Sequence, residues 1–278
     1  KIGPEPRKAS KFMNLFKIEA GTPQHIGNRP RQNDRVAVLT GARAPGHVLA
    51  ILSDGLNGPA GAEQVLHTAK QVFDSFKPGD TPNPERLAEL LREIVQETHL
   101  VIKMNAVTTG EEAHASFVGL LLSPHGEAVW AHVGDSRLYR FENGEPVLRT
   151  NDEAYIEHLV GTDKLALEAA RNHRRSKILL NVLGNTRKEP FVTVGWQMGM
   201  APGDQFLLCS DGLWHFFTDA ELGAALARST PRQASEMLIN KASERSQGKG
   251  GNCSMAIVKL VKALPEGTSV FGAAPGRP

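Results

Sequence analysis

Short runs of apolar and β-branched residues, separated by polar or glycine-containing turns, recur along the chain. Their length and composition are typical of buried β-strands. The segments between them agree with this, because GARAPG joins the first two runs and Asn143-Gly144 is a favoured hairpin pair. Strands are expected at residues 35–40, 47–53, 117–123, 128–134, 136–142, 145–150, 191–198, 205–210 and 254–262.

Other segments carry apolar residues at the spacing of one helix face. Two of them have clear start signals. Asn83 can cap a helix that has proline at its first position, and Thr218 can form a capping box with Glu221. The expected helices cover residues 61–76, 84–104, 154–183, 219–227 and 232–245.

The order of these elements indicates the fold class. Strands are followed by two helices, more strands, two further helices and a final strand, which differs from the regular alternation that builds a parallel doubly wound sheet. The expected fold is therefore α+β, with a central β-sandwich of two antiparallel sheets flanked by pairs of α-helices.

Length and composition agree with one globular domain. The chain has 278 residues, of which 40% are apolar and 22% charged, which is enough for a sizeable core. We expect the domain to cover residues 13–264, with Met13 as a hypothetical natural start. Residues 1–12 are expected to be a tail or an expression remnant, and residues 265–278 a flexible C-terminal tail.

Charge and cysteine content narrow the range of partners. The formal net charge of +2 gives no argument for nucleic acid as a partner. The two cysteines, Cys209 and Cys253, form neither a disulfide framework nor a CxxC metal site and are expected to be small core residues. No apolar run approaches the ~20 residues that span a bilayer. We expect a cytoplasmic monomer without a membrane partner.

Three aspartates follow predicted buried strands. Asp54 and Asp211 each open an Asp-Gly-Leu sequence, and Asp135 stands in GDSR. One Asp-Gly pair alone favours a plain turn. Three carboxylates that converge at strand ends would repel each other unless a cation or protons lay between them. Because Mg²⁺ and similar ions prefer oxygen ligands, the pattern points to a divalent metal site.

A fourth polar stretch, GNRPRQND, precedes the first strand and contains Arg29 and Asp34. A guanidinium group near a metal site suggests that the ligand is a phosphate, whose oxygens match its planar fork. A solvated basic loop that ends in an aspartate turn explains this stretch equally well when it is taken alone.

Taken in order, these motifs resemble the metal-dependent protein serine/threonine phosphatase family of the protein phosphatase 2C type, as a bacterial single-domain member. The resemblance runs from about Met13 to Leu260. It rests on the spacing of Arg29, Asn33 and Asp34, on DGLNGPAGAE from Asp54, on GDSR, on DGLW from Asp211, and on the asparagine of GGNCS. The segment 151–184 is similar to the helical flap region of that family.

The resemblance implies a metal site in a cleft at one end of the sandwich. Asp54 would bridge two Mg²⁺ or Mn²⁺ ions, the Gly55 carbonyl would bind the second ion, and Asp211 the first. Asp34 would act through a metal-bound water, and Asp135 would help to hold a third, weaker ion.

The resemblance also implies the reaction. A metal-bridged water would attack phosphorus in phosphoserine or phosphothreonine of a protein, while Arg29 holds the phosphate. Ser136 and Arg137 would brace their loop. The partners would be a phosphorylated protein substrate and a cognate serine/threonine kinase whose action the enzyme opposes.

Several positions depart from the family pattern. Gly251 stands where an aspartate that binds the first ion is expected, although Asn252 of the same motif is kept. Asn33 replaces an acidic residue, and Ala115-Ser116 replaces two threonines. His215 stands where an acid often supports the third ion. It could carry a proton near the phosphate or mark a weakened third site, and the second option is favoured.

The absence of the carboxylate at position 251 leaves more than one function open. The chain could be an active enzyme that needs more Mn²⁺, a weakened enzyme, or a pseudophosphatase that binds phosphoproteins as a regulatory module. A regulatory phosphatase domain acting on an anti-sigma factor is a more remote alternative. The substitution at Gly251 could also be engineered.

Overall fold

The computed structural model describes residues 16–151 and 181–263. The two predicted tails lie outside these ranges, and so do residues 154–180 of the charged segment expected to be helical at 154–183. The extent of the domain therefore stays a prediction. The last three residues of the charged segment are not helical, because Leu183 forms a β-bridge with Ala115. Within the described ranges, no helix combines the length and the apolar character that crossing a bilayer requires.

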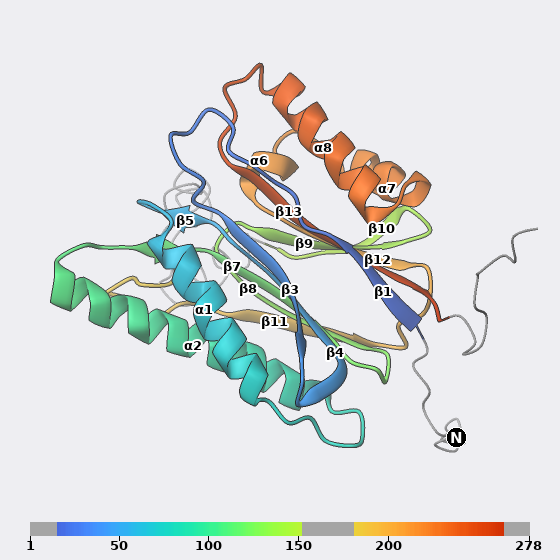
Figure 1. The fold of residues 1–278 in the computed structure, drawn as a ribbon, viewed down its shortest axis with the longest axis horizontal. Coiled ribbons are helices and arrows are strands. Elements are labelled where there is room, and N and C mark those ends of the chain that lie inside the picture. Colours follow the sequence, from blue (N-terminus) through green and yellow to red (C-terminus); the bar gives the residue numbers. More distant parts are fainter. Residues whose placement is uncertain (1–15, 152–180, 264–278) are drawn as a thin grey trace, which may run out of the picture.

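Two antiparallel sheets form the centre of the molecule (Figure 1). The first sheet has the order β1 (Phe16–Gly21), β13 (Cys253–Lys262), β12 (Asp204–Cys209), β9 (Arg137–Glu142) and β10 (Glu145–Arg149), and β2 (Gln24–His25) also pairs with β13. The second sheet has the order β11 (Thr193–Met198), β8 (Glu127–Val133), β7 (Phe117–Leu122), β4 (Ala44–Ser53) and β3 (Arg35–Gly41).

Helices cover the outer face of each sheet (Figure 1). The second sheet carries α1 (Ala60–Ser75) and α2 (Pro84–Thr109), and the first carries α7 (Asp219–Arg228) and α8 (Pro231–Arg245). The predicted α+β sandwich with flanking helix pairs is confirmed. The sequence did not predict the short helix α6 (Asp211–Trp214) or the small ladder of β5 (Gly55–Leu56) and β6 (His114–Ala115).

The strands read as continuous apolar runs because both of their faces are covered. In β4, Leu49 and Ile51 face the layer under α1 and α2, whereas Ala50 and Leu52 face the layer between the sheets. In β12, Leu207 lies in a third layer, under α7 and α8. A four-layer arrangement of helices, sheet, sheet and helices therefore encloses three apolar layers, and each central strand contributes to two of them.

The local signals for turns and caps were accurate. The Asn83 side chain accepts a hydrogen bond from the Arg86 amide at 3.1 Å, directly before the proline that starts α2. Thr218 and Glu221 form the predicted capping box of α7. Asn143 and Gly144 both have positive φ angles, 52° and 87°, as the tight turn between β9 and β10 requires. Helix α2 runs five residues further than predicted, to Thr109, and ends at Gly110 in the left-handed conformation.

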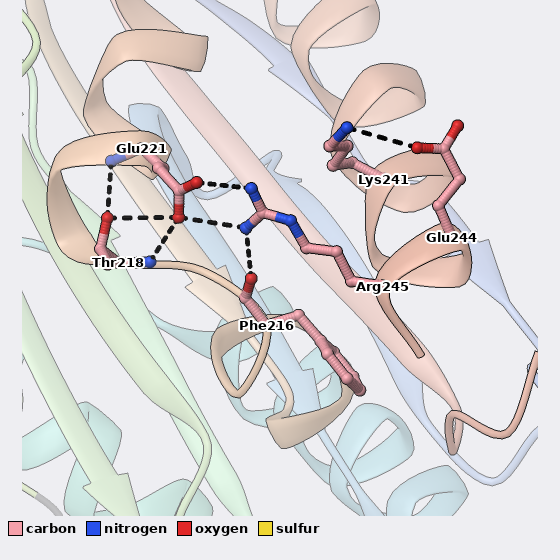
Figure 2. Close-up of polar contacts among 6 residues, drawn as sticks. All are labelled: Phe216, Thr218, Glu221, Lys241, Glu244 and Arg245. Atoms are coloured by element: carbon pink, nitrogen blue, oxygen red, sulfur yellow. Dashed lines mark hydrogen bonds and ion pairs between the residues drawn. The ribbon is translucent and has the colours of Figure 1, made fainter. Parts of the chain in front are cut away.

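An arginine on α8 ties that helix to the start of α7 (Figure 2). The guanidinium group of Arg245 binds both carboxylate oxygens of Glu221 and donates to the Phe216 carbonyl. The same Glu221 accepts the Thr218 amide at 2.9 Å. The guanidinium group also lies 4.7 Å from the ring centroid of Phe217. One side chain thus fixes the loop that connects α6 to α7.

The Arg245 hydrogen bond, together with the Thr218 amide, lowers the pKa of Glu221 to about 2. A carboxyl with a depressed folded-state pKa stabilises the protein fully above its ordinary pKa of 4.5, and this contribution is lost as the pH falls toward 2. We therefore expect Glu221→Gln, which keeps the capping box, to lower the Tm at about pH 7 and to do so less at about pH 3.

The matched control is Glu244→Gln, which removes the single exposed contact of Glu244 with Lys241 at 3.4 Å (Figure 2). Its Tm should stay near that of the wild type at both pH values. If Glu221→Gln lowered the Tm by the same amount at both pH values, the ion pair would not be the cause of the decrease.

Candidate metal centre

A cavity of about 840 Å³ opens where β4, β8 and β12 end. Strands β4 and β8 run in the same direction because both are antiparallel to β7 between them, so the residues after them meet at one edge. Every predicted site residue except Ser136 lines this cavity. The structure brings them together, and their roles stay predictions.

Asp54 is positioned through its backbone by a pair of serines. Its amide donates to Ser116 Oγ at 2.9 Å, and its carbonyl accepts the Ser116 amide at 2.9 Å. Ser116 Oγ in turn lies 2.8 Å from Ser136 Oγ, which is fully buried. Ser136 therefore braces the site from beneath instead of lining it. The contact of Ser116 with Asp54 was not predicted; Ser116 was noted only because it stands where the family has threonine.

Both Asp-Gly pairs of the site need their glycines because backbone passes close by. A Cβ on Gly55 would lie 2.4 Å from the Gly58 carbonyl oxygen and 2.8 Å from that of Asn33. A Cβ on Gly212 would lie 2.0 Å from the Asn252 carbonyl oxygen. Real Cβ atoms do not come this close to other atoms, so only glycine fits at these two positions.

Asp34 is the most deeply buried carboxylate of the cavity, with 1% of its surface exposed. Its Oδ2 accepts a hydrogen bond from Ser210 Oγ at 2.9 Å, and its carbonyl accepts one from the Gln24 side chain at 2.9 Å. Its Oδ1 has no hydrogen-bond donor among the described residues. An acceptor left unpaired in a buried place is a vacancy that a cation or a water can fill.

The carboxylates raise one another's pKa. Burial, followed by the charges of Asp34 and Asp211, raises the pKa of Asp54 to about 9, and Asp135 adds to the effect. Burial likewise raises the pKa of Asp34. Without a cation, the cluster must therefore hold protons near neutral pH.

The donor set fits a hard divalent ion. Four carboxylates line the cavity, and they suit Mg²⁺ or Mn²⁺ better than soft metals; Arg29, Arg137 and Lys249 line it as well. Over residues 16–151 and 181–263, however, no three acidic, histidine or cysteine side chains are grouped so that they alone could hold an ion. A bound ion would need backbone carbonyls, water or ligand oxygens as well.

Trp214 holds the loop that carries Asp135. Its indole Nε1 donates to the Asp135 carbonyl at 3.0 Å. The guanidinium carbon of Arg137 lies 3.5 Å from the centroid of the Trp214 ring, and a terminal nitrogen of Arg137 lies 3.3 Å from the Tyr139 hydroxyl. These contacts fit the bracing role expected for Arg137. Trp214 was noted in the sequence only as part of DGLW, and its contact with the Asp135 loop was not predicted.

Asn252 connects the last strand to the loop that carries Arg29. Its Nδ2 donates to the carbonyls of Ile26 at 2.7 Å and Arg31 at 3.0 Å, and its Oδ1 accepts the Asn33 amide at 2.8 Å. All three bonds join residues more than 200 positions apart in the sequence. The asparagine that completes the family motif thus fixes both ends of the Arg29 loop.

Gly251 lies beside Arg29 with space around it. A Cβ on Gly251 would have as its nearest neighbours Arg29 Nε at 3.7 Å and Nη2 at 3.8 Å, which are ordinary contact distances. Its φ angle is not among the positive ones. The backbone therefore accepts a side chain at this position. Lys249, which the sequence interpretation did not single out, lines the same end of the cavity.

His215 lies at the exposed side of the cavity. Its Nδ1 is 3.0 Å from the Asp211 carbonyl oxygen and 3.8 Å from Asp211 Oδ2, and its ring stacks on Trp214 with centroids 3.8 Å apart. Because Nδ1 faces a carbonyl, the Nδ1–H tautomer is favoured and Nε2 is left as the acceptor. This geometry does not decide between the two roles suggested for His215.

A two-sheet sandwich with an acid-lined cavity at its strand ends is the architecture of metal-dependent phosphatases of the protein phosphatase 2C type. The serine/threonine phosphatase of S. agalactiae has this fold, with a TM-score of 0.71 and 21% identity over 88% of this chain and 100% of that one. The catalytic domain of the serine/threonine protein phosphatase PstP, solved in complex with 2 manganese ions, gives a TM-score of 0.64 and 22% identity over 88% of this chain and 99% of that one.

Sequence relatives agree with the fold. The chain is 26% identical over 215 residues to serine/threonine protein phosphatase PstP of Mycobacterium tuberculosis, which is 76% of this chain and 40% of that protein. It is also 26% identical over 215 residues to the serine/threonine phosphatase stp of Listeria innocua, which is 84% of that protein. No family model matches the chain. The resemblance to the protein phosphatase 2C family is confirmed by these relatives and by the fold.

The electrostatics of the cluster predict opposite effects of one substitution on stability and on metal binding. Because the pKa of Asp54 is raised, its ionised form destabilises the metal-free fold above the ordinary pKa of 3.8. We expect Asp54→Asn to raise the Tm of the metal-free protein at neutral pH, by relief of roughly 1–3 kcal/mol. The same change should remove the rise in Tm that Mn²⁺ causes in the wild type.

Thermal unfolding with a chelator and with added Mn²⁺ measures both effects. Asp74→Asn is the control, because Asp74 is an exposed residue of α1 paired with Lys70. It should leave both Tm values near those of the wild type. An Asp54→Asn variant that Mn²⁺ stabilises as strongly as the wild type would exclude Asp54 as a ligand.

Proposed function

We propose that this chain is a Mg²⁺- or Mn²⁺-dependent phosphatase that removes phosphate from phosphoserine and phosphothreonine in proteins. The observation that carries the proposal is that one cavity is lined both by four carboxylates and by Arg29; the carboxylates are those of Asp34, Asp54, Asp135 and Asp211. The names of the relatives, which are serine/threonine phosphatases, support the same substrate class. The PstP structure with manganese supports the choice of metal.

The carboxylates would hold the ions. Asp54 and Asp211, with the Gly55 carbonyl, are the proposed direct ligands, Asp34 the ligand that acts through water, and Asp135 the support of a third, weaker ion. When bound, such ions act as Lewis acids that make a water nucleophilic near neutral pH. The serine pair under Asp54 and the Ser210 contact of Asp34 keep the carboxylates in place as charge changes around them.

Arg29 would orient the substrate. Its exposed guanidinium group lines the same cavity as the carboxylates and can bind two phosphate oxygens at once. Asn252 fixes the loop that carries it, and Lys249 adds a second positive charge at the same end. The phosphate would therefore be contacted by the ions that the carboxylates hold and by these two positive charges, which would stabilise charge that develops on the phosphoryl oxygens.

A second candidate function is a phosphoprotein-binding module without turnover. One argument for it is Gly251, which lies beside Arg29 and has no carboxylate where the family has one. The other is that the described residues do not supply a complete set of side-chain ligands for an ion. Either function implies a phosphorylated protein as the partner, and the enzyme would oppose the kinase that made the phosphate.

Hydrolysis of a small aryl phosphate separates the two candidates. We expect turnover that rises with Mn²⁺ and falls more than about 100-fold in Asp211→Asn, since loss of a direct ligand exceeds the cost of losing an outer partner. Asp219→Asn, a change at an exposed ion pair on α7, serves as the control and should keep full activity. Phosphopeptide binding without any turnover at millimolar Mn²⁺ would favour the binding module.

The vacancy at Gly251 gives a second prediction. Because a side chain fits there, Gly251→Asp should fold and bind Mn²⁺ more tightly, by about 10–100-fold, with a matching gain in turnover at low Mn²⁺. Gly251→Ala fills the same space without a carboxylate and should show neither gain. Titration calorimetry with Mn²⁺ measures the affinity independently of activity. Equal affinities in all three proteins would mean that other groups already supply the ligand.

A further inference from the structure

A second cavity, of about 150 Å³, lies beside the metal centre. It is enclosed by α8 on one side and by the loop 248–251 on the other. The two cavities share four lining residues, Gly212, Phe216, Gly250 and Gly251. Three of the four have no side chain, so the wall shared by the two cavities consists of backbone and of Phe216.

The wall of the second cavity combines polar and apolar groups in similar measure and includes no aspartate, glutamate, lysine or arginine. Ile239 and Ala242 of α8 and Cys253 of β13 form one part of it. Burial, with the charges of Asp34 and Asp211, raises the pKa of the Cys253 thiol to about 12, so the thiol stays neutral and unreactive near neutral pH. Ser246 Oγ donates to the Ser243 carbonyl at 2.9 Å, and His25 Nδ1 accepts the Gly27 amide at 3.0 Å.

The walls of this cavity are held in place by contacts described above. Arg245 of α8 binds the Phe216 carbonyl and Glu221, which fixes the Phe216 loop relative to the helix (Figure 2). On the opposite wall, a Cβ on Gly27 would lie 2.1 Å from the Gly251 carbonyl oxygen, so the two loops touch backbone to backbone. The cavity is thus a preformed feature between fixed elements.

Its size and position select the kind of occupant. Independent small-molecule sites usually have volumes of about 300–1,000 Å³, so this cavity is too small for a cofactor or an effector. It has room for one aliphatic side chain. Arg29, the proposed phosphate ligand, lies against Gly251 on the shared wall. A chain whose phosphate is bound at Arg29 can therefore place a neighbouring residue here.

We propose that this cavity is a substrate subsite that binds a small apolar side chain close in sequence to the phosphorylated residue. The inference rests on the proposed function, because it takes the substrate to be a phosphoprotein. It makes the apolar wall of Ile239 and Ala242 a determinant of which phosphorylated sites bind best, and it leaves the chemistry at the metal centre unchanged.

The test compares phosphopeptides that differ at one position near the phosphorylated residue. The two positions before it and the two after it are varied one at a time, and each carries either valine or leucine, or aspartate. Affinity is measured with non-hydrolysable phosphonate analogues, so the result does not depend on turnover. We expect the wild type to prefer the apolar residue at one of these positions by roughly 10-fold.

Ser243→Leu, on the α8 wall, fills the cavity with a residue that suits a helix. It should abolish this preference while the Mn²⁺-dependent hydrolysis of a small aryl phosphate stays at the wild-type rate. Asn240→Leu places the same side chain on the exposed face of α8 and should keep the preference. If Ser243→Leu does not fold, Ile239→Ala enlarges the cavity and should shift the preference from valine toward leucine or methionine.

The outcomes separate the two proposals. Absence of any apolar preference in the wild type, or an unchanged preference in the filled and enlarged variants, overturns the subsite. Absence of aryl phosphate hydrolysis overturns the phosphatase assignment alone, since the binding series still reports on the subsite.

Discussion

The central constraint on this structure is the placement of four carboxylates around one partly buried space. Like charges at short range in a poorly solvated place are unfavourable, as the raised pKa of Asp54 shows. The fold bears this cost because the acids stand at the ends of strands that are fixed on both faces by apolar layers. Such strands cannot move apart to relieve the repulsion. A divalent cation is the natural relief, and the stored unfavourable energy favours its binding.

The contacts around the acids are mostly to backbone atoms. Ser116 binds the backbone of Asp54, Trp214 binds the carbonyl of Asp135, and the Asn252 backbone passes against Gly212. Backbone contacts fix where a carboxylate begins, and Asp34 Oδ1 has no hydrogen-bond donor among the described residues. The site thus combines rigid positions with side chains that can still accept a ligand, which is the arrangement that metal binding and catalysis both require.

Sequence reasoning was strong where the signal is local. The hairpin at Asn143, the cap at Asn83 and the capping box at Thr218 depend on neighbouring residues, and each is present in the structure. The strand ends also predicted which aspartates would meet. Contacts between distant segments could not be predicted. Nothing near Asn252 in the sequence shows that it binds residues 26, 31 and 33. Nothing in the sequence of α8 indicates a cavity beside the metal centre.

The triple contact of Asn252 also bears on how the protein is made. A ribosome synthesises the Arg29 loop early and residue 252 more than 200 positions later. Until that residue has left the ribosome and β13 has entered the sheet between β1 and β12, the loop lacks its anchor. A nascent chain can therefore carry all four acids of the site while the loop with Arg29 still lacks its anchor. The entry of β13 into its sheet is therefore the step that fixes the Arg29 loop.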